Sequence, residues 1–320
     1  MNPFLPINSD DIAARGWDRV DFALVTGDAY VDHPSFGAAV IARILESEGY
    51  RVGIIPQPDW TTPDSLKVLG RPRLGFLVTS GNLDSMVNHF TAAKKKRRND
   101  AYTPGGQAGR RPDRAVTVYA NLVRQAYKKI PVIIGGLEAS LRRMAHYDYW
   151  KDALRRSVLL DSKADLLVYG MGEAAVKTIA AALDASVPAA DIRDVPGTVY
   201  ACGISEVPDE AVILPDHEAL KADRRAFAES FRIQYENADP FTGRRLAEPY
   251  GGRAVVQNPP SPPLGQEEMD TVYSLPYARD AHPSYTEAIP AVEEVKFSLV
   301  SSRGCFGACA FCALAFHQGR

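Results

Sequence analysis

Short apolar runs alternate with longer amphipathic runs from about residue 18 to residue 183. The apolar runs predict strands over 22–26, 51–55, 74–78, 131–135 and 165–169. The amphipathic runs predict helices over 35–49, 112–129, 150–160 and 173–183. Alternating strands and helices are typical of a parallel, doubly wound sheet with helices on both faces. We therefore expect an α/β fold with a Rossmann-like N-terminal domain.

Glycines and polar residues follow several of these strands. They lie at 27–28, 79–81, 135–136 and 170–173, and in a parallel sheet they would share the edge where ligands bind. Gly170, Gly172 and Ala175 satisfy a dinucleotide-binding spacing between a strand and a helix. We do not favour a dinucleotide here, because this unit comes last in the alternation and its turn glycines need no cofactor.

The pattern changes after about residue 191. Strands are predicted over 195–202, 210–214 and 253–257, and a helix over 216–235 with Asp216 as its cap. The proline-rich stretch 258–265 predicts a stiff connector, and a further strand is predicted over 295–300. The expected domains are therefore a Rossmann-like domain over 1–200, a connector over 201–290, and the beginning of another domain over 291–320.

The overall charge gives no indication of a polyanionic partner, since 37 basic residues face 39 acidic ones. One local exception is the basic loop over 94–98, which continues to Arg110 and Arg111 and could hold phosphates of RNA or of a nucleotide. Another is the aromatic run 146–150, which lies among arginines and could stack on bases. For the loop we favour a solvated surface, and for the run the packed face of a helix. Nucleic-acid binding is therefore only weakly supported.

Three of the four cysteines lie close together, at Cys305, Cys309 and Cys312. The C-x3-C-x2-C spacing and the glycines at 304 and 307 allow three thiolates to converge on one centre. Ordinary ferredoxin-type clusters use four cysteines, so an iron–sulfur cluster here would keep one iron without a protein ligand. The same three cysteines with His317 also match a tetrahedral Cys3His zinc site. Spacing alone leaves both readings open, with the cluster favoured.

The N-terminal residues and the lengths of the apolar runs indicate where the protein is located. The first ten residues contain no basic stretch followed by an apolar core, and no apolar run reaches the length of a membrane span. We expect a cytoplasmic protein that does not engage a membrane. A reducing compartment would keep the clustered thiols available for a metal. Cys202 stands apart and is expected to be a small buried residue near a strand.

The cysteine pattern, with Phe311 as the aromatic residue before the last cysteine, resembles the signature of the radical S-adenosylmethionine (SAM) superfamily. The resemblance implies that Cys305, Cys309 and Cys312 ligate a [4Fe-4S] cluster whose open iron binds SAM, and that Phe311 packs near the SAM adenine. It also implies reductive cleavage of SAM to a 5′-deoxyadenosyl radical. An electron donor such as flavodoxin or ferredoxin would be the partner, and the substrate is not indicated.

Upstream segments resemble the YgiQ group of radical SAM proteins. They are 100–106, 111–114, 134–143, 145–150 and 164–170. Several radical SAM proteins place a cobalamin-binding domain ahead of the barrel, and the layout here resembles theirs. His33, however, lies at the wrong spacing for the motif Asp-x-His-x-x-Gly, so we expect a loop or capping role and do not favour cobalamin.

The resemblance places the start of a barrel at the end of this sequence. A (β/α) barrel needs about 200 residues, whereas the chain stops at Arg320, shortly after the cysteines. We therefore expect an N-terminal portion with a truncated barrel. The other SAM contacts and the catalytic residues would lie beyond Arg320.

Overall fold

A computed structural model of the chain describes residues 3–307 and 309–319. The chain divides into two compact units, one of Met1–Glu138 with Leu264–Ser302 and one of Ala139–Pro263 with Arg303–Arg320. Each unit combines segments that are far apart in the sequence. The units therefore do not coincide with the three ranges predicted above.

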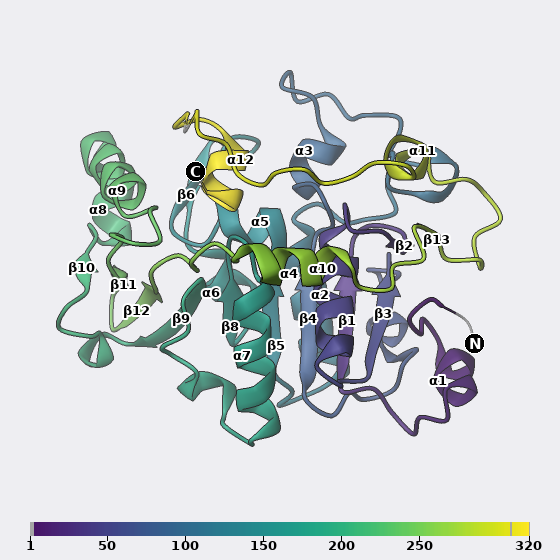
Figure 1. Cartoon of the computed structure of the whole chain (residues 1–320). Coiled ribbons are helices and arrows are strands. Elements are labelled where there is room, and N and C mark those ends of the chain that lie inside the picture. The colour runs from purple at the N-terminus through teal and green to yellow at the C-terminus, as the bar shows by residue number, and fades with distance from the viewer. Residues whose placement is uncertain (1–2, 308, 320) are drawn as a thin grey trace. The chain divides into compact units, whose positions relative to one another are not determined.

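The first unit alternates strands and helices as its sequence predicts (Figure 1). Its elements are α1 (Ser9–Ala14), β1 (Phe22–Thr26), β2 (Val31–Asp32), α2 (Gly37–Ser47), β3 (Val52–Pro56), the 3-10 helix η1 (Pro63–Lys67), β4 (Gly75–Thr79), α3 (Ser85–His89), η2 (Pro104–Gly106), α4 (Ala115–Ala126), β5 (Val132–Gly135), α10 (Gln266–Tyr273), β13 (Asp280–Ala281) and α11 (Pro290–Val295). The helix α5 (Gly136–Leu141) begins in this unit and ends in the other.

Four strands of the first unit form a parallel sheet in the order β3-β1-β4-β5. Phe22 lies opposite Val52 on one side and Gly75 on the other, and the pairs continue in register to the ends of the strands. All five residues of β1 are buried, as expected for a central strand of a sheet covered by helices. Helix α2 packs on β1 and β3, and α4 packs on β4 and β5. The predicted α/β class with a parallel sheet is thus confirmed.

The segment 264–302 returns to the first unit and packs on it. Strand β13 pairs antiparallel with β2, Asp280 opposite Asp32. Ile289, just before α11, and Val292 of α11 join a buried apolar cluster with Val31 and Phe36. The prediction of a strand over 295–300 is wrong, because residues 291–295 are helical and 296–300 form a turn and irregular chain. Pro290 is well suited to the first turn of a helix, where no backbone N–H is needed. In addition, no described strand pairs with residues 295–300.

The second unit contains the remaining elements. They are β6 (His146–Asp148), β7 (Ala153–Arg155), α6 (Val158–Ser162), β8 (Leu166–Val168), α7 (Glu173–Asp184), η3 (Ala189–Asp191), β9 (Thr198–Gly203), η4 (Ile204–Glu206), β10 (Val212–Ile213), α8 (His217–Ala222), α9 (Arg224–Glu236), β11 (Leu246–Tyr250), β12 (Arg253–Gln257) and α12 (Ala313–Gln318). Five of its strands follow the order β8-β9-β12-β11-β10; among the described pairs of these strands, β10 and β11 run parallel and the others antiparallel.

Two helices predicted in this unit differ from the structure. The predicted helix 150–160 is replaced by a hairpin of β6 and β7 followed by the short α6. The Asp148 carboxylate accepts hydrogen bonds from the backbone N–H groups of Trp150 and Lys151, which favours a turn over a helix at this point. The predicted helix 216–235 begins at its Asp216 cap but breaks at Asp223, whose carboxylate caps α9.

Candidate functional site

The cysteine segment belongs to the second unit from Arg303 onward. Cys305 and Cys309 are exposed, and Cys312 is half-buried directly before α12. The Cys312 carbonyl accepts a hydrogen bond from the Phe316 backbone N–H at 3.3 Å, which closes the first turn of α12. All three thiols are therefore accessible to an incoming ligand.

Two of the three sulfurs border the same residue. A methyl group built on Gly307 would lie 3.5 Å from Cys305 Sγ and 3.9 Å from Cys309 Sγ. Cys309 Sγ also donates a weak hydrogen bond to the Gly307 carbonyl at 3.7 Å. Within 3–307 and 309–319, no three His, Cys, Asp or Glu side chains are close enough together to hold a metal ion. The three sulfurs must therefore move closer together before all of them can bind one centre.

Contacts on both sides of the cysteines attach this segment to the second unit. Arg303 Nη1 donates a short hydrogen bond to Glu173 Oε1, forming an ion pair whose two side chains are 13% and 5% exposed. Glu173 is the first residue of α7. The Gly304 backbone N–H donates to Gln318 Oε1 at 3.0 Å, which closes the segment on itself. Sequence reasoning missed this ion pair, since its partners are 130 residues apart.

His317, the fourth ligand of the alternative zinc site, makes a hydrogen bond with a serine hydroxyl. Its Nδ1 lies 2.9 Å from Ser140 Oγ, and the hydroxyl also accepts a hydrogen bond from the Gly170 backbone N–H at 3.1 Å. Burial, helped by the positive charge of Arg143, lowers the pKa of His317 to about 4. The imidazole is thus neutral at neutral pH. The described structure does not bring it together with the cysteines into a metal-binding group.

Phe311 projects into solvent between Cys309 and Cys312, with 92% of its surface exposed. The neighbouring Phe306 is 99% exposed. A large exposed aromatic side chain is available to pack on a partner or a ligand. Its contact with an adenine ring stays a prediction.

The dinucleotide-like turn after β8 is occupied by the cysteine segment. A methyl group on Gly170 would lie 3.3 Å from the His317 carbonyl oxygen. Gly172 precedes α7, and the Glu173 carboxylate lies in the first turn of that helix. A phosphate bound at the start of α7 would be repelled by the Glu173 carboxylate. The geometry therefore does not favour a dinucleotide at this turn.

The strand ends of the first unit come together as their sequence predicts. A methyl group on Gly136 would lie 2.4 Å from Thr79 Oγ1, and one on Gly81 only 2.1 Å from Asp28 Oδ1. Gly81 has φ +103°, in the region that favours glycine. The ends of β1, β4 and β5 thus approach one another so closely that only glycine fits at these positions.

Asp28, Asp100 and Arg111 form a buried charge cluster at this edge. Arg111 Nη2 lies 2.9 Å from Asp28 Oδ1 and 3.1 Å from Asp100 Oδ2, and all three side chains are at most 3% exposed. Arg111 Nη1 also donates to the Ser80 carbonyl at 2.8 Å. Burial raises the pKa of Asp28 to about 6, although Arg111 acts to lower it. Burial thus makes Asp28 easier to protonate than an ordinary aspartate.

The remaining residues singled out in the sequence have local roles or lie at the surface. The His33 ring accepts a hydrogen bond from the Ser35 backbone N–H at 3.1 Å, so it has the loop role that was one of the two expected. Residues 94–98 are exposed, as the solvated-loop reading expects. The 146–150 run forms β6 and the turn after it, so the helix face expected for it is wrong; Tyr147 and Tyr149 are 51% and 44% exposed. Cys202 is buried in β9, as expected.

The sequence model described as Radical SAM N-terminal matches residues 4–298. The chain therefore belongs to the Radical SAM N-terminal family, which confirms the resemblance inferred from the sequence. The matched range ends before the first clustered cysteine, Cys305. Among the described residues, no helix has the length and apolar character needed to cross a membrane.

Relatives of this chain include two UPF0313 proteins. One, UPF0313 protein CPE1196 from Clostridium perfringens (strain 13 / Type A), is 55% identical over 322 residues, covering 100% of this chain and 49% of its own length. Another, from Clostridium botulinum (strain ATCC 19397 / Type A), is 55% identical over 320 residues, covering 99% and 50%. The chain thus spans about half the length of the curated relatives it matches.

A solved structure of TsrM, a radical S-adenosylmethionine methyltransferase from Kitasatospora setae, also matches part of the chain. It was solved with tryptophan substrate and a SAM analog bound. The TM-score is 0.38 at 16% identity, and the match covers 56% of this chain and 28% of TsrM. A similarity at this level carries no conclusion about this chain.

Proposed function

We propose that this chain supplies the cluster-binding segment of a radical SAM enzyme, with Cys305, Cys309 and Cys312 as ligands of a [4Fe-4S] cluster. The observation that carries the proposal is the attached loop on which two accessible sulfurs border Gly307 and the third lies one turn further on. Membership of the Radical SAM N-terminal family supports it.

The donor set fits such a cluster. Thiolates are the ligands that iron–sulfur clusters prefer, whereas carboxylates suit harder cations. The nearby acid Glu173 is already engaged by Arg303. Three protein ligands would keep one iron free for SAM. Gly307 lies between two of the sulfurs, and the absence of a side chain there gives the cluster room.

The chain's own part in the chemistry is to hold and position this segment. The cluster, when bound, would supply the electron for reductive cleavage of SAM, and an electron donor such as flavodoxin or ferredoxin would have to replenish it. The Arg303–Glu173 ion pair and the His317–Ser140 contact fix the two ends of the segment. Phe311 would pack against the SAM adenine. The substrate stays open, and cobalamin is not part of the proposal, since His33 lies at the wrong spacing for the cobalamin motif.

The test compares cysteine variants of the full-length protein after anaerobic reconstitution with iron and sulfide. Cys305→Ala should lose most of the bound iron and sulfide, because two ligands hold a cluster far less well than three. Cys202→Ala is the matched control, since Cys202 is buried in β9, and it should keep both.

The same samples distinguish the zinc site. A His317→Ala variant should retain its iron, because the cluster does not use this residue. If the protein as isolated held one zinc per chain, and His317→Ala released it, a Cys3His structural site would replace the proposed cluster.

A further inference from the structure

The first unit contains a pocket that the proposed cluster chemistry does not use. It has a volume of about 530 Å³, within the range of about 300–1,000 Å³ typical of small-molecule sites. Its lining comes from the loop after β3, from α3, from the basic loop and from the start of α4. All of these lie in Met1–Glu138, so the pocket is complete within one unit.

Two basic residues of the exposed loop line the pocket. Lys96 and Arg97 line it from the basic loop, and both residues are exposed. The lining carboxylates are already engaged elsewhere, Asp113 with His89 at 2.7 Å and Asp100 with Arg111 at 3.1 Å. Arg97 Nε donates to the Val87 carbonyl at 3.4 Å, so its contact is with a neutral group. An anion is the ligand that the two loop cations favour.

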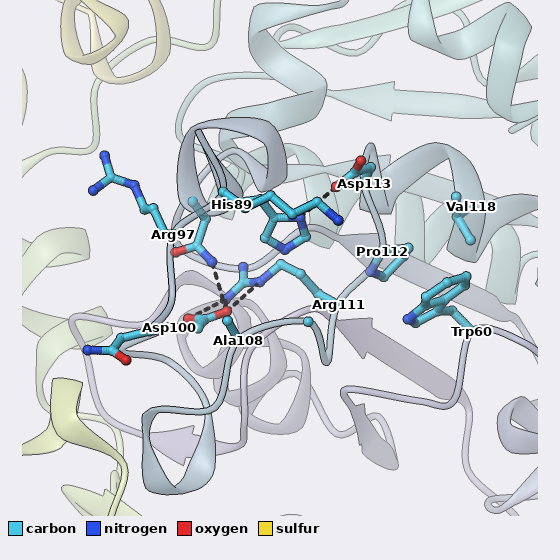
Figure 2. A pocket seen from close by; sticks show the side chains of 13 residues that line it. Trp60, His89, Arg97, Asp100, Ala108, Arg111, Pro112, Asp113 and Val118 are labelled. Atoms are coloured by element: carbon cyan, nitrogen blue, oxygen red, sulfur yellow. Dashed lines mark hydrogen bonds and ion pairs between the residues drawn. The ribbon is translucent and has the colours of Figure 1, made fainter. Parts of the chain in front are cut away.

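The other end of the pocket is aromatic. Trp60 is 41% exposed and lines the pocket, and Figure 2 shows it at the opposite end from Arg97, with Arg111 between them. An exposed indole offers a flat face on which a base or another planar ring can stack. The pocket therefore combines a stacking face with a cationic end.

The floor between the two ends is rigid. Arg111 is held by Asp28, Asp100 and the Ser80 carbonyl, and Asn88 Nδ2 donates to Asp100 Oδ2 at 2.8 Å. Figure 2 shows the contacts of Arg111 with Asp100 and of His89 with Asp113. Side chains fixed in this way hold a binding surface in shape before the ligand arrives, which reduces the entropy cost of binding.

We propose that this pocket binds a nucleoside phosphate, with the base on Trp60 and the phosphates at Lys96 and Arg97. The pocket lies beside the ends of β1 and β4, since Arg111 contacts both Asp28 and the Ser80 carbonyl. Ligands of parallel α/β sheets bind at this edge. The site needs no cluster and no cysteine.

The experiment titrates ADP, inorganic pyrophosphate and adenosine into the full-length protein by isothermal titration calorimetry. We expect one ADP per chain, with adenosine and pyrophosphate each binding at least about tenfold more weakly, because each reaches only one end of the pocket. The paired variant Lys96→Ala/Arg97→Ala should weaken ADP by about tenfold or more, and Trp60→Ala by a similar factor.

The matched control is Lys95→Ala/Arg98→Ala, which removes the same two charges from the same exposed loop but from positions that do not line the pocket. It should change ADP affinity by no more than about twofold. Equal losses in the two paired variants would show unspecific attraction and overturn the proposal. So would the absence of ADP binding, or tight binding of a single-stranded RNA oligonucleotide alone.

Iron-free protein should bind ADP as well as reconstituted protein does. The titration is repeated on the Cys305→Ala variant, in which ADP affinity should be unchanged. A loss of ADP binding in Cys305→Ala would overturn the independence of the pocket from the cluster. Failure of ADP to bind to any sample would leave the iron measurements, and with them the proposed function, untouched.

Discussion

The strand-end cluster of the first unit and the cysteine segment of the second are built in opposite ways. Asp28, Asp100 and Arg111 are buried and paired with one another, so their geometry is complete without a ligand. Cys305 and Cys309 are exposed, and the three thiols are not gathered in the described structure. The difference indicates that the chain itself determines the geometry of the strand-end cluster, whereas the arrangement of the three thiols depends on what the cysteine segment binds.

The largest effect should come from removing the shared cation of the buried cluster. Arg111→Ala leaves Asp28 and Asp100 buried without their partner, and we expect it to lower the free energy of unfolding by about 3–5 kcal/mol. The neighbouring Arg110→Ala also removes one positive charge, but from the surface, and should change the free energy of unfolding by less than about 0.5 kcal/mol. Urea denaturation of both variants measures the difference. Similar values for the two would mean that the cluster does not stabilise the fold.

The next largest effect should come from a substitution where the strand ends approach each other closely. Gly81 and Gly109 have similar backbone angles, φ +103° and +92°, but a methyl group on Gly81 meets Asp28 while one on Gly109 meets nothing within 4 Å. Gly109→Ala therefore reports the backbone cost alone, about 1 kcal/mol. Gly81→Ala should cost about 2 kcal/mol more, since Asp28 has to move. Equal costs by urea denaturation would contradict the packing described at this edge.

A smaller effect should appear in the pH dependence of stability. The raised pKa of Asp28, about 6 against an ordinary value of 3.8, means that the folded chain binds this proton more tightly than the unfolded chain does. Its contribution to stability is therefore present at low pH and lost as the pH rises through 6. Between pH 5 and pH 7.5 the wild type should lose about 1 kcal/mol relative to Asp28→Asn. A difference of the opposite sign would show that Asp28 is stabilised in its charged form.

The smallest effect should lie in the cysteine segment. Phe306 and Phe311 are 99% and 92% exposed, so replacing either with Ala should change the free energy of unfolding of this chain by less than about 0.5 kcal/mol. Thermal unfolding of the two variants measures this. A loss of several kcal/mol would mean that the segment is packed into the fold, and the contrast between the two regions would disappear.

Local sequence patterns predicted the first unit well because its strands are continuous apolar runs. The strand predicted over 22–26 matches β1 (Phe22–Thr26), and the strand predicted over 131–135 differs from β5 (Val132–Gly135) by one residue. Strand direction was harder to predict, because it depends on partners elsewhere in the chain. Strand β8 pairs antiparallel with β9, a pairing that the local pattern did not predict.

The sequence identified the cysteines but not what holds them in place. Their spacing is a local signal, whereas the Arg303–Glu173 pair joins residues 130 positions apart. Asp28 was singled out as the residue after a strand, yet its pairing with Arg111 needs the two strand ends to meet. Long-range pairs of this kind leave no periodicity in the sequence. Two buried acids facing one arginine become evident only in three dimensions.

The central claim is that the cysteine segment holds a cluster with an open iron. The most direct test is electron paramagnetic resonance of the reconstituted, dithionite-reduced full-length protein, recorded with and without SAM. We expect a [4Fe-4S]⁺ signal that changes when SAM is added and that is absent from Cys305→Ala. Stoichiometric zinc without such a signal, or a cluster signal that SAM does not alter, would contradict it.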